Sequence, residues 1–167
     1  MISSSALTGA AALLLIAAGA AKLADPTRTA GALAAMGWPA SPLLIRTGAV
    51  AELTLGAATL AIGGPALAML VTASFLGFAL FVMAALRNDT PIGSCGCFGQ
   101  ADTAPRRGHV VVVLLLAAGC TLAAVRDAAP LIDTSWPNWV VAGMVAAVAY
   151  GSLVHRGRPQ QTLQRAR

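Results

Sequence analysis

Two cysteines separated by one glycine, Cys95 and Cys97, are the residues of this chain best suited to chemistry. Thiols this close in sequence can form a disulfide only in a small ring, and Gly96 supplies the permissive backbone that such a ring needs. Strained, exposed disulfides tend to be labile and redox-active. The spacing also leaves open a metal-binding corner or two unrelated thiols in a turn, although two ligands alone are too few for a zinc site.

A second candidate is formed by Lys22 and Glu52, the one lysine and the one glutamate of the chain. Both lie in strongly apolar stretches, where ionisable groups are costly and normally face a partner inside a helix bundle. Gly48, Glu52 and Gly56 recur at four-residue steps, which predicts the face where a neighbouring helix packs closest. We therefore predict a Lys22–Glu52 pair. Such a pair is either a structural salt bridge or a proton-handling or quinone-contacting site. Alternatively, Lys22 does not pair with Glu52 and extends its side chain to the membrane interface.

Three further features lie near the cysteines or in the following span. Cys120 is interpreted as a small packing residue, with a role as resolving thiol as the alternative. His109 is interpreted as a capping or interfacial residue, with a proton carrier near the thiols as the alternative. Pro105 predicts the first turn of a helix whose positive end, together with Arg106 and Arg107, would lie near the cysteines and lower their pKa.

The segments that must position these residues are membrane helices. The chain is 57% hydrophobic and 10% charged, with a mean hydropathy of +0.77, which indicates an integral membrane protein. A span needs about 20 apolar residues, and no strand-like alternation competes. We predict an all-α bundle of four core transmembrane helices plus a fifth, within a domain of residues 1–155. The predicted spans are residues 2–24, 43–63, 66–86, 109–125 and 139–154.

The connections between these spans differ in character. Residues 25–42 hold several prolines and Trp38, which indicates a loop or an interfacial segment. The cysteine loop covers residues 87–108, and the basic tail, residues 156–167, is predicted to be disordered and cytoplasmic.

The net charge of +5 follows from an uneven distribution of basic residues. Ten of the eleven lysines and arginines lie at the first connection, at the cysteine loop or in the tail, and the exception is Arg126. This positive-inside pattern predicts a multi-pass protein of a bacterial-type inner or plasma membrane, with the N-terminus outside and the C-terminus cytoplasmic. The cysteine loop, Lys22 and Glu52 then share the cytoplasmic side. The basicity is explained by topology and an attraction to anionic membrane lipid, not by nucleic acid.

Three stretches of the chain resemble the MauE branch of the DoxX-like membrane proteins. They are GAAKLADP at residues 19–26, ELTLG at residues 52–56 and CGCFG at residues 95–99, within a similarity that covers about residues 5–125. The cysteine element is the most specific of the three. The lysine and glutamate stretches are shared more broadly among DoxX-like proteins.

The resemblance implies a small membrane protein of methylamine utilisation. Such a protein assists disulfide formation or maturation of the methylamine dehydrogenase small subunit, working with a thioredoxin-like partner. Cys95 and Cys97 match the cysteine pair of the family, and Lys22 and Glu52 match its intramembrane charges. The wider group makes a quinone a candidate electron acceptor. Two function classes follow: a membrane thiol–disulfide or thiol:quinone oxidoreductase, and a non-enzymatic assembly or scaffold subunit whose cysteine loop docks a partner.

Overall fold

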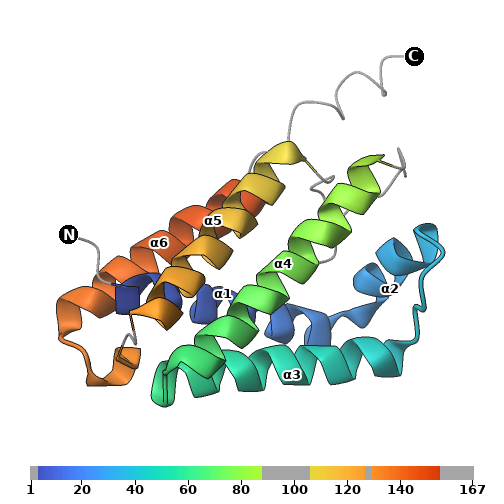
Figure 1. The fold of residues 1–167 in the computed structure, drawn as a ribbon. Helices are drawn as coiled ribbons and strands as arrows, with labels where there is room; N and C mark the ends of the chain where they lie inside the picture. The colour runs from blue at the N-terminus through green and yellow to red at the C-terminus, as the bar shows by residue number, and fades with distance from the viewer. Residues whose placement is uncertain (1–3, 88–105, 127–128, 155–167) are drawn as a thin grey trace.

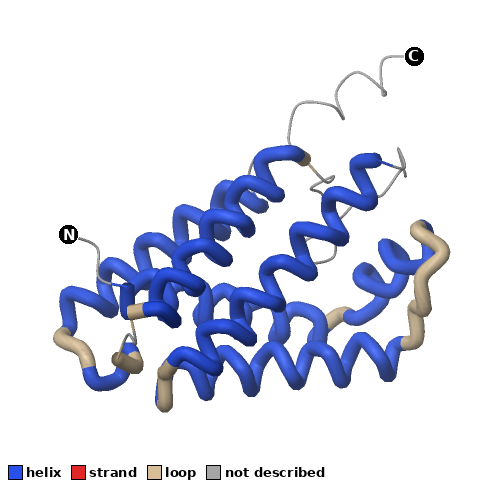
Figure 2. Tube along the Cα trace, viewed as in Figure 1, coloured by secondary structure: helices blue, strands red, loops and turns tan. Residues whose placement is uncertain are grey.

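The computed structural model describes residues 4–87, 106–126 and 129–154 of the chain. These residues form six α-helices and one short 3-10 turn, and no strand occurs among them (Figures 1 and 2). The helices are α1 (Ser4–Ala24), α2 (Pro26–Ala35), α3 (Pro42–Ala61), α4 (Pro65–Arg87), α5 (Arg107–Val125) and α6 (Trp136–Val154), and the turn is η1 (Leu131–Asp133). The prediction of an all-α bundle is confirmed.

Four of these helices, α1, α3, α4 and α5, are long and apolar enough to cross a membrane. Helix α6, which is as long as α5, packs along α1 and flanks this group as the fifth long helix. The chain is therefore a multi-pass membrane protein, as the hydropathy predicted.

The long helices alternate in direction, which gives the bundle two distinct ends (Figure 1). We call the end where α1 and α4 finish and α3 and α5 begin the basic end. Within the described residues it carries every lysine and arginine except Arg126. The opposite end, called the turn end, holds Gly63, Gly64 and η1. This separation of charge is the one that the sequence predicted, and the orientation of the two ends in the membrane stays a prediction.

Helix α1 is the centre of the bundle. It contacts α3, α5 and α6 extensively and also touches α2, α4 and η1. Its sequence is rich in alanine and glycine, and such small side chains let several helices approach one axis closely. The main core cluster gathers Leu14 and Leu15 of α1, Phe75 of α4 and Leu116 of α5. Helix α1 therefore positions α3, α5 and α6, whereas α4 packs mainly against α5.

Helix α2 occupies the first connection, residues 25–42, beside the basic end. Asp25 starts it by accepting a hydrogen bond from the Thr27 amide at 3.1 Å, and Pro26 supplies a backbone angle suited to a first turn. Its Ala32 is buried against Ala85 of α4. The predicted interfacial segment is therefore a short helix that covers part of the basic end.

Candidate functional site

Lys22 and Glu52 form an ion pair between α1 and α3 near the basic end. Lys22 Nζ donates a hydrogen bond to Glu52 Oε1, and the side chains are only 7% and 16% exposed. The other carboxylate oxygen, Oε2, is buried without a hydrogen-bond partner among the described residues. The lysine therefore points into the bundle and not to the interface, which rules out the snorkelling interpretation.

Two glycines let α1 and α3 approach closely enough to form this pair. A Cβ atom at Gly19 would lie 2.6 Å from the Ala49 carbonyl oxygen, and one at Gly56 would lie 2.7 Å from the Ala12 carbonyl oxygen. Each glycine faces the backbone of the other helix, so the helices are in contact over two turns. Lys22 follows Gly19 by one turn and Glu52 precedes Gly56 by one turn, which brings the charges together.

The prediction that Gly48 shares this contact face is wrong. A Cβ atom at Gly48 would meet nothing within 4 Å, and the residue is exposed. A helix turns by about 100° per residue, so the eight residues between Gly48 and Gly56 rotate the two positions about 80° apart. The face therefore includes Glu52 and Gly56 but leaves Gly48 outside.

A third helix contributes an aromatic ring to the ion pair. Lys22 Nζ lies 4.6 Å from the ring centroid of Phe78 on α4, a distance at which the ring face attracts a cation. Phe78 in turn packs edge-on against the fully buried Phe75, with ring centroids 5.8 Å apart. The charged pair thus connects α1, α3 and α4 near the basic end.

Cys95 and Cys97 lie outside the described residues, in the segment of residues 88–105 between α4 and α5. The two helices that flank this segment are joined by Thr72 of α4. Its hydroxyl lies 3.4 Å from both the Ala117 carbonyl oxygen and the Thr121 hydroxyl of α5. The last residue of α4, Arg87, and the first of α5, Arg107, both lie at the basic end.

Helix α5 begins next to the segment that the structure does not describe. The helix starts at Arg107, and its N-cap residue Arg106 has an extended backbone with φ −136° and ψ 154°. Pro105, which the sequence predicts for the first turn, lies outside the described residues, so this role stays a prediction.

Cys120 is a packing residue of the core. Its side chain is fully buried in the main core cluster, which includes Leu14 of α1. Thirteen residues separate it from Arg107, or about 20 Å along the helix axis. A thiol at this depth is shielded from exchange partners at the basic end, which supports the packing interpretation of the sequence.

His109 connects α5 to α6 near the basic end. Its ring is buried and forms a hydrogen bond with the backbone of Leu153. Its Nδ1 atom has no hydrogen-bond partner among the described residues. The residue is therefore buried between two helices and does not lie in an exposed interfacial position.

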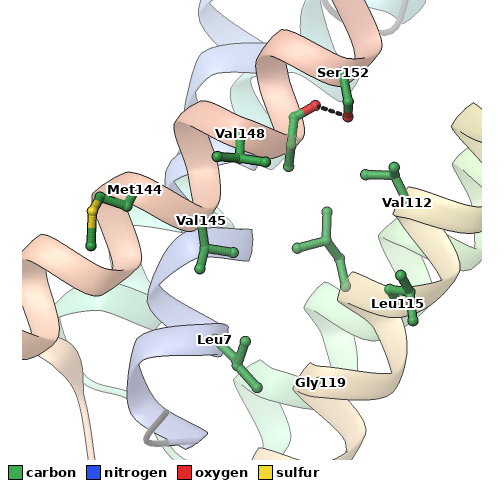
Figure 3. A pocket seen from close by; sticks show the side chains of 10 residues that line it. Leu7, Val112, Leu115, Gly119, Met144, Val145, Val148 and Ser152 are labelled. Atoms are coloured by element: carbon green, nitrogen blue, oxygen red, sulfur yellow. Dashed lines mark hydrogen bonds between the residues drawn. The ribbon is translucent and has the colours of Figure 1, made fainter.

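Between His109 and the turn end, α5 and α6 separate and leave an apolar groove of about 470 Å³ (Figure 3). Figure 3 shows α6 and α5 facing each other across this space, with Leu7 of α1 between them. The residues that line the groove are Leu7, Val112, Leu115, Leu116, Gly119, Met144, Val145, Val148, Ala149 and Ser152. The one hydroxyl among them, on Ser152, donates to the Ala149 carbonyl oxygen at 2.7 Å.

The described residues offer little to a bound cofactor or metal. Residues 4–87, 106–126 and 129–154 contain no cluster of three or more His, Cys, Asp or Glu side chains that could hold a metal ion. In the groove, the Ser152 hydroxyl is used within its own helix, so the carbonyl groups of a quinone would find no free donor there. The groove therefore does not fit a quinone head group.

Comparison with known protein families identifies the family of this chain. The family described as methylamine utilisation protein MauE matches residues 1–126, from α1 to the end of α5. The chain belongs to the MauE family. Comparisons with curated proteins and with solved structures found no significant match. Membership of the MauE family suggests a role in methylamine utilisation, and α6 lies beyond the matched region.

Three parts of this arrangement were not anticipated from the sequence. These are the close approach at Gly19, the Phe78 ring beside Lys22, and the groove between α5 and α6. The close approach at Gly19 could have been predicted, because Gly19 lies one turn before the only lysine of the chain. A small residue at that position lets a partner helix come close to the charge. The ring and the groove depend on how the helices are oriented, which leaves no comparable signal in the sequence.

Proposed function

We propose that this chain supports the maturation of a partner enzyme in methylamine utilisation through thiol–disulfide exchange at Cys95 and Cys97. Family membership supports the pathway. The observation that carries the proposal is that α4, which leads into the cysteine segment, packs along α5 and also places its Phe78 ring over the ammonium group of the Lys22–Glu52 pair. Helix α4 thus links the buried charge pair to the start of the segment that holds the cysteines.

The exchange balances between the cysteine pair and a thioredoxin-like partner. A thiolate of the partner attacks one sulfur of the Cys95–Cys97 disulfide, and a mixed disulfide forms as the original S–S bond breaks. The second thiolate of the partner then resolves the mixed disulfide. The partner loses two electrons and becomes a disulfide, while the pair gains two electrons and two protons. With a client dithiol in the place of the partner, the same steps oxidise the client and reduce the Cys95–Cys97 pair. The reverse sequence, with an oxidised thioredoxin-like protein as the oxidant, forms the Cys95–Cys97 disulfide again.

In this proposal Lys22 and Glu52 act as positioning residues. They fix α1 against α3, and Phe78 ties both to α4, the helix that leads into the cysteine segment. Glu52 Oε2, which lacks a partner among the described residues, is available to accept a hydrogen bond or a proton near the basic end. The charges therefore support the site from within the membrane without exchanging electrons themselves.

The side of the membrane follows from charge. We propose that the basic end is cytoplasmic, because Arg28, Arg46, Arg87, Arg106 and Arg107 all lie there. A cytoplasmic cysteine pair would receive electrons from a cytosolic thiol reductant. Labelling of intact cells with a membrane-impermeant thiol reagent tests this orientation: the pair should react only after the membrane is opened. Reaction in intact cells would place the basic end outside.

The function itself is tested by serine substitution of each cysteine. Cys95→Ser and Cys97→Ser should each abolish formation of the disulfides in the co-expressed client, the methylamine dehydrogenase small subunit that the family resemblance implies. Cys120→Ala is the matched control and should leave maturation intact, because Cys120 is buried in the core. If the double serine variant still matures the client, the chain acts as a scaffold and the redox proposal is wrong.

A further inference from the structure

The groove between α5 and α6 is an open hydrocarbon surface in the membrane-spanning part of the molecule. Leu115 and Val148, on its two sides, are 68% and 73% exposed. Apart from the Ser152 hydroxyl, which is bonded to its own helix, its side chains carry no polar group. An occupant therefore gains contact and burial from the groove but no hydrogen bond, which favours a simple hydrocarbon chain.

The shape of the groove argues against a transmembrane helix of another protein. An α-helix is about 10 Å wide and rises 5.4 Å per turn, so a space of 470 Å³ holds only about one helical turn. On α5 the groove extends from Val112 to Gly119, about 10 Å along the axis. A slender chain that enters from one end fits this space better than a helix that must pass through it.

Beyond Val112, the surface of α5 toward the basic end is also uncovered. Gly108 lies one turn above Val112 on the same face of α5, and a Cβ atom at Gly108 would meet nothing within 4 Å. The next residues are Arg107 and Arg106, both exposed. Arg107 is five residues from Val112, which is about 8 Å along the axis. Two positive charges thus lie just beyond the end of an apolar groove.

The backbone at this point also favours an anion. The His109 amide donates to the Arg106 carbonyl oxygen at 3.0 Å, whereas the amides of Arg107 and Gly108 have no hydrogen-bond partner among the described residues, and the Arg106 side chain caps neither. The N-terminus of a helix attracts negative charge, and the two arginines add to this attraction. An apolar groove that ends at such a cationic terminus matches the two parts of an anionic phospholipid.

We propose that the chain binds one anionic phospholipid at this place. An acyl chain fills the groove between α5 and α6, and the phosphate is bound by Arg106, Arg107 and the first amides of α5. This inference is independent of the thiol–disulfide proposal, because it uses none of the cysteines. It predicts a bound lipid in the purified, full-length protein.

The experiment measures lipid retention by native mass spectrometry of the full chain with added phosphatidylglycerol or phosphatidylcholine. The wild type should retain one phosphatidylglycerol, and far less phosphatidylcholine. Val148→Trp should abolish retention of both, since the indole fills the groove. The matched control Val111→Trp should behave as the wild type, because Val111 is also exposed on α5 but does not line the groove. If Val148→Trp folds poorly, Leu115→Trp serves as the second variant, because its indole fills the groove from the α5 side.

The charge part of the proposal is tested separately. Replacing both Arg106 and Arg107 by glutamine should weaken phosphatidylglycerol binding about thirtyfold at low salt while leaving phosphatidylcholine binding unchanged. Equal retention of phosphatidylglycerol by wild type and both folded tryptophan variants would overturn the proposal. So would an unchanged lipid preference after loss of the arginines. A lipid-free dimer that Val148→Trp dissociates would instead identify a second copy as the occupant.

Discussion

Helix α1 packs closely against α3 on one side, whereas on its other side the neighbouring helices α5 and α6 leave a groove. On one side, Gly19 and Gly56 bring α3 into backbone contact with α1, and this contact encloses the Lys22–Glu52 pair. On the other side, α6 packs along α1 but separates from α5, and an apolar groove remains between them. The first interface encloses an ion pair between closely packed backbones, whereas the groove of the second carries no charge and is exposed.

The difference shows what each kind of interface requires in a membrane. Lipid tails are as apolar as leucine, so helices gain little from burying apolar surface against each other and must pack closely or pair polar groups. The α1–α3 interface does both. Helices α5 and α6 pair polar groups where His109 bonds to the backbone of Leu153, and along the groove they do neither. Hydrocarbon from the membrane is an adequate neighbour for the groove.

The largest expected effect comes from breaking the charge pair. Lys22→Met leaves Glu52 buried and unpaired, and should destabilise the fold by about 3–5 kcal/mol. The double variant Lys22→Met with Glu52→Gln should recover most of this loss, because no buried charge remains. The midpoint of thermal unfolding in detergent measures both. A Lys22→Met protein as stable as the wild type would mean that the pair does not hold α1 against α3.

A smaller effect should follow from adding one methyl group at the close contact. Gly56→Ala places a Cβ atom 2.7 Å from the Ala12 carbonyl oxygen, so the helices must move apart, at a cost of about 1–3 kcal/mol. The same change at Gly143 on α6 meets nothing within 4 Å and should be neutral. Unfolding midpoints of the two variants give the comparison directly. Equal midpoints would remove the distinction between the two interfaces.

Much of this arrangement could be predicted from the sequence. Hydropathy located the membrane helices, because a span must satisfy its own backbone and carry about 20 apolar residues. The pairing of Lys22 with Glu52 was predictable, since a chain with one lysine and one glutamate at membrane depth has few ways to neutralise them.

What could not be predicted depends on rotation and crossing angle. Gly48 and Gly56 look equivalent in sequence, yet only Gly56 faces α1, because a four-residue step drifts around the helix. The groove arises from the angle between α5 and α6, and no residue pattern specifies that angle. The short helix α2 was expected only as a loop or interfacial segment, although Asp25 and Pro26 are typical start signals.

The smallest expected effect concerns α2, which contacts α1, α3 and α4 at the basic end. Hydrogen bonds from Thr27, together with Arg28, lower the pKa of the Asp25 carboxyl. The stabilisation that the ionised Asp25 carboxylate gives to the start of α2 is therefore fully present above the ordinary aspartate pKa of about 3.9. This stabilisation is lost as the pH falls through the lower pKa that Asp25 has in the folded protein.

Asp25→Asn should remove this acid dependence while keeping a competent cap. Hydrogen exchange of the α2 amides, measured at neutral and acidic pH and corrected for intrinsic rates, reports the change. The wild type should lose protection in α2 on acidification, and Asp25→Asn should not. Identical pH profiles for the two proteins would show that Asp25 does not control this helix.

The central claim, that Cys95 and Cys97 act as a redox pair, is tested most directly by trapping their thiols in native membranes. In a Cys120→Ala background, cells are quenched with acid and treated with a thiol reagent that adds mass, with and without prior reduction. We expect a population without label that gains two labels after reduction, and a mixed disulfide with a thioredoxin-like protein when either cysteine is changed to serine. Two labels in every sample and no mixed disulfide would contradict it.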